Sequence, residues 1–231
     1  MRIVLKIGHA LFKGNSVDVE KIREAGDAVL RLHNAGHRLI VIVGGGEPSR
    51  AYIKAARSLG ADLATCDEVG IMVTRLNALL FSIALGDASS RRIIRSFEEL
   101  EEQLAAAGNR IIVGGGFTPA QSTDAVAALA AERMKADLLI KTTDVDGVYD
   151  SDPEKNPDAK LLREVDVRRL REILSRGEST PGEYRLLDQV SLSILERSRI
   201  PVVIVNGSDP ENIIRAASGE KVGTRISYSS R

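Results

Sequence analysis

The sequence has few cysteines and few aromatic residues, and neither sign of charge is in excess. It has one cysteine, Cys66, no tryptophan and 3% aromatic residues among 231. A single cysteine cannot form a disulfide within the chain, and few aromatics leave few stacking platforms for single-stranded nucleic acids. The 32 basic residues balance 32 acidic ones. Without a net charge to attract nucleic acid or a membrane surface, we expect neither as a partner.

Long hydrophobic runs and metal-ligand spacings are also scarce. The chain opens with "MRIVLKIG", a strand pattern interrupted by Lys6 and lacking the apolar stretch of a signal peptide. We expect no span of about 20 apolar residues anywhere. Three scattered histidines have no cysteine or carboxylate at ligand spacing, so we expect no metal site built by the protein alone. These features favour a cytoplasmic location.

The chain does contain a regular alternation of short β-branched runs and longer helical patterns. Helical periodicity covers residues 17–35, 48–59, 67–85 and 123–136, and Ser96 with Glu99 forms a capping box for another helix. Further helices are expected in "DVRRLREIL", "DQVSLSILERS" and "PENIIRAAS". Strands are expected in "RIVLKI", "RLIVIV", "RIIVGGG", "DLLIKT", "IPVVIVNG" and "GTRISYS". This alternation predicts an α/β fold, a three-layer α/β/α sandwich with a mostly parallel central sheet of about eight strands. No linker interrupts it, so we expect a single domain over 1–231.

Two triple-glycine runs, 44–46 and 114–116, each follow an expected strand and precede an expected helix. Backbone N–H groups at such a turn, together with the helix dipole, bind phosphate without a charged side chain. Neither run fits the G-x-x-x-x-G-K-[ST] or G-x-G-x-x-G pattern. The alternative is that glycine only permits a tight turn. The repetition favours two phosphate-bearing ligands at the carboxyl ends of the strands.

Three charged residues stand near these turns. Lys6 ends the first strand, Arg50 lies early in the helix after the first glycine run, and Asp124 opens the helix after the second. An ammonium or guanidinium group there can bind phosphate, and Asp124 can orient a lysine. The alternatives are a solvated lysine, a surface arginine and a helix cap. Spacing alone does not choose between these roles.

The segment "DLLIKTTDVDGVYDSDP" resembles the nucleotide-binding segment of the amino acid kinase family. Members of this family transfer the γ-phosphoryl group of ATP to a carboxylate, carbamate or phosphate. The resemblance covers nearly the whole chain, from Lys6 and the first glycine run through "GGGFTPAQSTDAVAALAAE". Within the family, "STDAVAALAAE" and "GEYRLLDQVSLSILERSRIPVVIVNG" are similar to the archaeal uridylate (UMP) kinases. This implies the amino acid kinase fold, an acceptor half over about 1–136, an ATP half over about 137–231, and a homohexamer.

The resemblance also implies a role for each matching residue. Catalytic roles fall to Lys6, Arg50 and Asp124, with Asp124 holding Lys6 in position. The implied ATP-binding residues are Lys6, Gly8, His9, Ala10, Gly46, Arg50, Thr143, Asp144, Tyr149 and Asp152. The implied UMP-binding residues are Gly45, Asp67, Gly116, Phe117, Thr118, Pro119, Ala120, Gln121, Ser122 and Thr123. Mg²⁺ is expected to enter with ATP, held mostly by phosphates and water.

The sequence departs from the family pattern at three positions. His9 and Ala10 stand where many members have a glycine and a serine, and Asp144 stands where archaeal members have asparagine. Asp144 either turns toward Lys141 or engages the nucleotide-bound Mg²⁺. Lys141 either supplies positive charge to the site or faces the other side of its strand. Rival functions are a nucleotide sensor or storage protein without turnover, and a kinase for another small phosphate or carboxylate.

Overall fold

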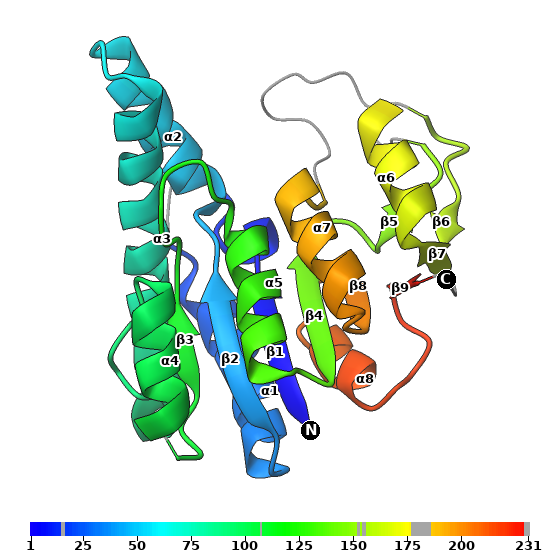
Figure 1. Ribbon diagram of the computed structural model, residues 1–231, viewed down its shortest axis with the longest axis horizontal. Coiled ribbons are helices and arrows are strands. Elements are labelled where there is room, and N and C mark those ends of the chain that lie inside the picture. Colours follow the sequence, from blue (N-terminus) through cyan, green and yellow to red (C-terminus); the bar gives the residue numbers. More distant parts are fainter. Residues whose placement is uncertain (15–16, 107, 152, 154–155, 177–185, 229–231) are drawn as a thin grey trace.

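A seven-stranded sheet forms the centre of the computed structural model, which describes the chain except residues 15–16, 107, 152, 154–155, 177–185 and 229–231. The strand order is β3-β2-β1-β4-β8-β9-β7 (Figure 1). The strands are β1 (Arg2–Ile7), β2 (Arg38–Val43), β3 (Ile112–Gly114), β4 (Leu138–Thr143), β7 (Glu164–Asp166), β8 (Val202–Asn206) and β9 (Thr224–Ser227). Among these strands only the β8–β9 pair is antiparallel. The mostly parallel sheet is therefore confirmed, with seven strands rather than eight.

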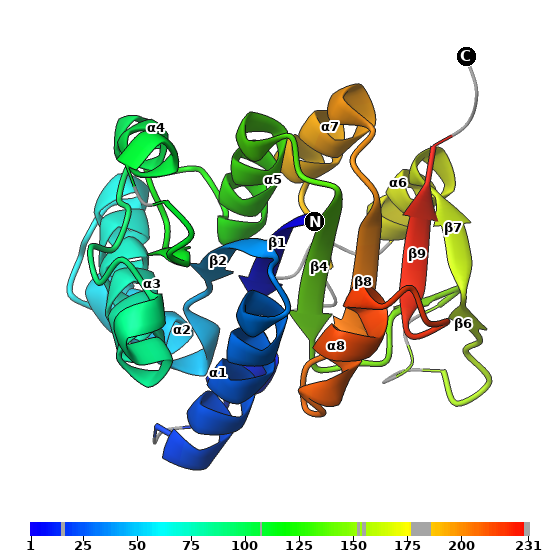
Figure 2. The same cartoon turned by 90° about the horizontal axis from the view of Figure 1, so that it is seen from below.

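Helices cover both faces of the sheet, as predicted for a three-layer fold (Figure 2). Helices α1 (Val19–Asn34), α3 (Leu63–Leu85) and α8 (Glu211–Ala217) bury one core with Ile3, Leu5 and Ile7 of β1. Helices α4 (Phe97–Ala106), α5 (Thr123–Met134), α6 (Val167–Arg176) and α7 (Gln189–Ser198) bury the other core with Val4. Successive residues of β1 thus face opposite layers, as the period of a strand requires.

Capping residues explain where the helices begin. The Asp62 carboxylate accepts from the Thr65 N–H at 2.7 Å, so α3 begins four residues before the expected position. Ser122 caps α5 in the same way through the Ala125 N–H at 3.0 Å. Ser96 accepts from the Glu99 N–H, but the Glu99 carboxylate accepts from the Arg95 N–H, so only half of the expected capping box forms. Helix α2 (Gly46–Ser58) starts within the first glycine run.

The irregular segment after β4 contains a short pair of strands that sequence analysis did not predict. Strand β5 (Val148–Tyr149) runs antiparallel to β6 (Leu161–Leu162), beside the main sheet. Strand β7 follows directly and pairs with β9 at the sheet edge. These strands have two or three residues each, too short for a hydrophobic period to reveal them.

Helix α3 contradicts the expectation that no long apolar span occurs. Residues 63–88 are long and apolar enough to cross a membrane by length and composition, with mean hydropathy 1.7 over an 18-residue window. Half of that window is buried within the fold, as in a core helix, so the feature is weak evidence for a membrane. Its outer side exposes Met72, Leu76, Leu79 and Ile83.

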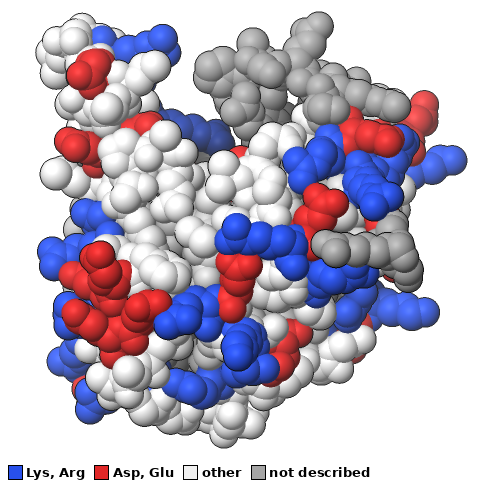
Figure 3. All heavy atoms as spheres, in the orientation of Figure 1, with Lys and Arg blue, Asp and Glu red and all other residues white. Residues whose placement is uncertain are grey.

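On the face drawn in Figure 3, basic and acidic side chains are interspersed, and acidic ones gather over α4.

Candidate active site

The strand order reverses between β1 and β4, which are parallel neighbours in the sheet. From β1 the chain proceeds to β2 and β3 on one side, and from β4 to β8 on the other. In open parallel sheets, the crevice at the carboxyl ends of such strands is where ligands bind. Lys6 of β1 and Lys141 of β4 are direct partners in the strand register at this position. The fold therefore places two lysines side by side at the point of strand reversal.

Both lysines are buried and share one carboxylate. Lys6 is 7% exposed and Lys141 4% exposed, so their charges need a partner. Asp124, in the first turn of α5, contacts Lys141 through Oδ1, and its Oδ2 lies 3.6 Å from the Lys6 Nζ. Sequence analysis predicted the contact with Lys6; the tighter contact with Lys141 answers which way the Lys141 side chain points. Lys141, which was one of the two partners expected for Asp144, is therefore in contact with Asp124.

Burial and charge compete within this cluster. Burial would raise the pKa of Asp124, but Lys141 and then Lys6 lower it more, so that the pKa lies below its ordinary value. Burial lowers the pKa of Lys141 to about 8, although the attraction of Asp124 opposes the shift. At neutral pH two ammonium groups and one carboxylate leave a single positive charge, which suits the binding of anionic phosphates.

The first glycine turn lies against the Lys6 ammonium. A Cβ added at Gly44 would lie 3.4 Å from the Lys6 Nζ, and one added at Gly8 would lie 3.1 Å from it. At Gly45 and Gly46, however, a Cβ would lie 2.3 Å from the Ser49 Cβ and the Phe12 carbonyl oxygen respectively. The protein's own packing therefore already requires glycine at these two positions, before any phosphate is considered. Arg50 is exposed in the second turn of α2.

The second glycine turn is held by α3. The Thr74 Oγ1 accepts from the Gly116 N–H at 2.7 Å, and Arg75 donates to the carbonyl oxygens of Gly116 and Phe117 at 3.1 and 3.0 Å. Asn77 of the same helix donates to the carbonyl oxygens of the first turn, Gly44 at 2.9 Å and Gly45 at 3.1 Å. Sequence analysis missed Thr74, Arg75 and Asn77, although three polar residues in an apolar helix were a visible signal.

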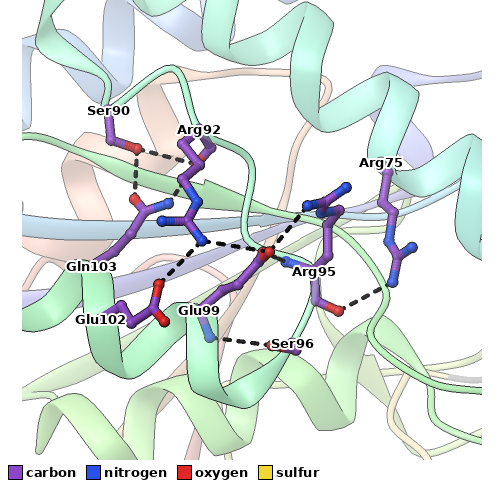
Figure 4. A network of polar contacts seen from close by, with 8 residues as sticks. All are labelled: Arg75, Ser90, Arg92, Arg95, Ser96, Glu99, Glu102 and Gln103. Atoms are coloured by element: carbon purple, nitrogen blue, oxygen red, sulfur yellow. Dashed lines mark hydrogen bonds and ion pairs between the residues drawn. The ribbon is translucent and has the colours of Figure 1, made fainter.

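A further polar network holds Arg75 itself in position (Figure 4). Arg75 donates to the carbonyl oxygen of Arg95 at 3.1 Å, and the Arg95 guanidinium bonds to Glu99 of α4 at the same distance. Arg92 lies 3.1 Å from Glu102 and 3.6 Å from Glu99. These contacts join the segment before α4 to α3, and they orient the Arg75 guanidinium toward the second turn.

The loop after the second turn carries most of the predicted UMP-binding residues. Ala120 adopts a left-handed conformation with φ of 59°, and its N–H donates to the Asp67 carboxylate at 2.8 Å. Thr118, Pro119 and Ala120 are exposed, whereas Phe117 is buried. Thr123 returns to the first turn, where its Oγ1 would lie 3.5 Å from a Cβ on Gly44. Asp67, predicted to contact ribose, therefore also fixes the tip of this loop.

Apart from Gly46 and Arg50 of α2, the predicted ATP-binding residues that the structure describes lie at the ends of β1, β4 and β5. The Gly8 N–H donates to the Thr142 Oγ1 at 3.2 Å, and His9 and Ala10 follow in a 3₁₀ turn over His9–Leu11. The hydroxyl of the buried Thr143 bonds to Asp144 at 3.2 Å. Tyr149 lies farther along, 3.5 Å from the Asp146 carboxylate. Asp152 lies outside the described residues. Within the described ranges, no group of three His, Cys, Asp or Glu side chains is placed to hold a metal.

The chain is similar to known proteins over nearly its whole length. The model of the amino acid kinase family matches residues 1–206. The chain is 43% identical to a uridylate kinase from Methanobrevibacter smithii and 45% identical to one from Methanothermobacter thermautotrophicus, each over 98% of this chain and 99% of the relative. The crystal structure of uridylate kinase from Archaeoglobus fulgidus superimposes with a TM-score of 0.87 at 39% identity, over 98% of this chain and all of that one. The resemblance inferred from the sequence is confirmed: the chain belongs to the amino acid kinase family.

Proposed function

We propose that this protein is an ATP-dependent UMP kinase, which transfers the γ-phosphoryl group of ATP to UMP and yields UDP and ADP. The observation that carries the proposal is the buried Lys6–Asp124–Lys141 cluster at the β1–β4 reversal, with the first glycine turn against Lys6. The uridylate kinases that match nearly the full chain support UMP as the acceptor. The product would feed pyrimidine nucleotide biosynthesis.

The reaction requires alignment and positive charge rather than a general base. A phosphate oxygen of UMP attacks the γ-phosphorus in line, forming one P–O bond as the bond to the ADP oxygen breaks. The UMP phosphate is already largely ionised near neutral pH, so no proton must be removed first. Lys6 supplies charge to the equatorial oxygens of the transition state, Arg50 reaches the phosphates from α2, and Asp124 orients Lys6. The buried position of Lys6 strengthens this electrostatic effect.

The two substrates would occupy the two sides of the reversal. UMP binds the acceptor half, about 1–136, between Gly45 and the loop of 116–123, with Asp67 near its ribose. ATP binds the other half, about 137–231, along Gly8, Thr143 and Tyr149. Mg²⁺ would enter with ATP, held mostly by phosphate oxygens and water. When bound, this ion neutralises charge on the triphosphate.

A homo-oligomer, a homohexamer by family resemblance, belongs to the same proposal. Met72, Leu76, Leu79 and Ile83 recur at helical spacing along the outer side of α3 and are 44–67% exposed. Such a stripe suits contact with another copy of the chain. A cytoplasmic location follows from the supply of ATP and UMP in that compartment, and neither nucleic acid nor membrane is proposed as a partner.

The proposal is tested by a coupled assay with ATP and Mg²⁺ and one acceptor at a time: UMP, CMP or dTMP. We expect rapid ADP formation with UMP and much slower formation with the other two. Nucleotide binding without turnover of any acceptor would favour the sensor or storage alternative. Turnover of a small carboxylate or another phosphate, with UMP inert, would keep the phosphotransfer chemistry and replace the acceptor.

A further inference from the structure

Lys141 has no role in the reaction as proposed above, yet it is among the most deeply buried charged residues. It is 4% exposed, belongs to a strand whose other residues are apolar or threonine, and pairs in register with Lys6. A buried ammonium is unfavourable unless a specific interaction compensates its desolvation. For Lys141 that interaction is the contact with the Asp124 Oδ1. The arrangement therefore raises the question of what Lys141 contributes.

The two oxygens of the Asp124 carboxylate face different lysines at different distances. Its Oδ1 is in direct hydrogen-bond contact with Lys141, whereas its Oδ2 lies 3.6 Å from Lys6, beyond hydrogen-bond distance. The Lys6 ammonium lies beside Gly8, which follows β1, and beside the first glycine turn, 3.1 and 3.4 Å from the positions of a Cβ on Gly8 and Gly44 respectively. Lys141 thus occupies the carboxylate that Lys6 would otherwise bind.

We propose that Lys141 is a positioning residue for phosphoryl transfer: it engages Asp124 so that the Lys6 ammonium stays directed toward the phosphates. This inference rests on the proposed function. Without Lys141, the carboxylate would have Lys6 as its single lysine partner, and the cluster's net charge would fall from one positive charge to zero. Lys6 would then be drawn toward Asp124 and away from the turns.

The inference predicts a dependence on pH. The charged groups that face Lys141 in the described structure are Asp124 from α5 and Lys6 from β1, while its register partner in β8 is the apolar Ile204. Because burial lowers the pKa of Lys141 to about 8, it loses its charge as the pH rises through that value. Asp124 is then released to Lys6, and kcat falls. In Lys141→Arg the charge persists, since arginine stays protonated, so this decline should be absent.

A double-mutant cycle separates positioning from simple structural support. Lys141→Met removes the charge at similar volume, and we expect kcat to fall on the order of 10²-fold with smaller changes in KM. Asp124→Asn leaves two buried ammonium groups and should also lower kcat. The double variant restores one net positive charge and frees Lys6, so its kcat should exceed that of Lys141→Met by about tenfold. If the kcat of the double variant is reduced by the product of the two single-variant reductions, the inference is wrong.

A crystal structure of ligand-free Lys141→Met tests the inference independently of catalysis. We expect the distance from the Lys6 Nζ to the Asp124 carboxylate to shorten from 3.6 Å to about 2.8 Å. An unchanged distance would refute the inference even if UMP kinase activity is found. If the wild type does not phosphorylate UMP, the proposed function fails, and this structure still decides the arrangement. Should Lys141→Met not fold, the alkaline pH profile of Lys141→Arg provides the decision instead.

Discussion

The two triple-glycine turns have the same sequence but different surroundings. The first, 44–46, joins β2 directly to α2 and lies against Lys6, the buried lysine at the strand reversal. The second, 114–116, is followed by a loop and is held from α3 by Thr74 and Arg75. The first turn is thus part of the charged centre, and the second is part of a frame that presents a binding loop. We propose that the same glycine motif serves phosphoryl transfer in the first turn and UMP recognition in the second.

The third glycine of each turn should respond differently to alanine. Gly46 has φ of 62°, and a Cβ there would lie 2.3 Å from a backbone oxygen, so we expect Gly46→Ala to lower the free energy of unfolding by roughly 2–4 kcal/mol. Gly116 has no such φ, and its nearest neighbours are side-chain atoms at 3.1 and 3.3 Å. Gly116→Ala should change stability by about 1 kcal/mol or less. Urea unfolding compares them; equal losses would refute the distinction.

Lys6→Ala tests the catalytic side of the comparison. We expect kcat to fall on the order of 10²-fold or more, about 2.7 kcal/mol, while the KM for UMP changes little, because the charge is needed most in the transition state. Lys21→Ala, which removes an exposed lysine of α1, is the matched control and should leave kcat near the wild-type value. A normal kcat for Lys6→Ala would show that Lys6 and the adjacent first turn do not take part in phosphoryl transfer.

Arg75→Ala tests the recognition side. The variant loses the donors to the carbonyl oxygens of Gly116 and Phe117, so the loop should be less well fixed. We expect the KM for UMP to rise by roughly 10- to 100-fold, about 1.5–3 kcal/mol, with a smaller change in the KM for ATP. Arg23→Ala, which removes an exposed arginine of α1 paired with Glu20 of the same helix, is the control and should leave both KM values near those of the wild type. Equal rises in the KM values for UMP and ATP would show that Arg75 supports the fold in general rather than the loop that binds UMP.

Asp67→Ala should have the smallest effect of the series. Its carboxylate accepts from the Ala120 N–H at the loop tip but is exposed, so we expect the KM for UMP to rise about tenfold. Asp67→Asn keeps an acceptor oxygen and should lie between the wild type and the alanine variant. An asparagine variant as impaired as alanine would show that the negative charge itself, rather than the hydrogen bond, is what UMP binding needs.

The order of elements and the position of both glycine turns could be predicted because hydrophobic period and turn residues are local signals. The partners of those turns could not. Glycine is required at Gly46 by Phe12, which lies 34 positions away, and the pairing of Lys6 with Lys141 depends on the order of strands in the sheet. The sequence indicated that Asp124 holds Lys6, but not that a second lysine shares it. The role of Arg75 could not be predicted because its partners, Gly116 and Phe117, lie 41 and 42 positions away along the chain.

The central claim is that the β1–β4 reversal is where both nucleotides meet. The most direct measurement is a crystal structure of the wild-type protein with UMP and a non-hydrolysable ATP analogue. We predict the γ-phosphate within hydrogen-bond distance of the Lys6 ammonium, and the uridine against the loop of 116–123. UMP bound away from that loop, or a triphosphate that leaves Lys6 without a phosphate contact, would contradict the account.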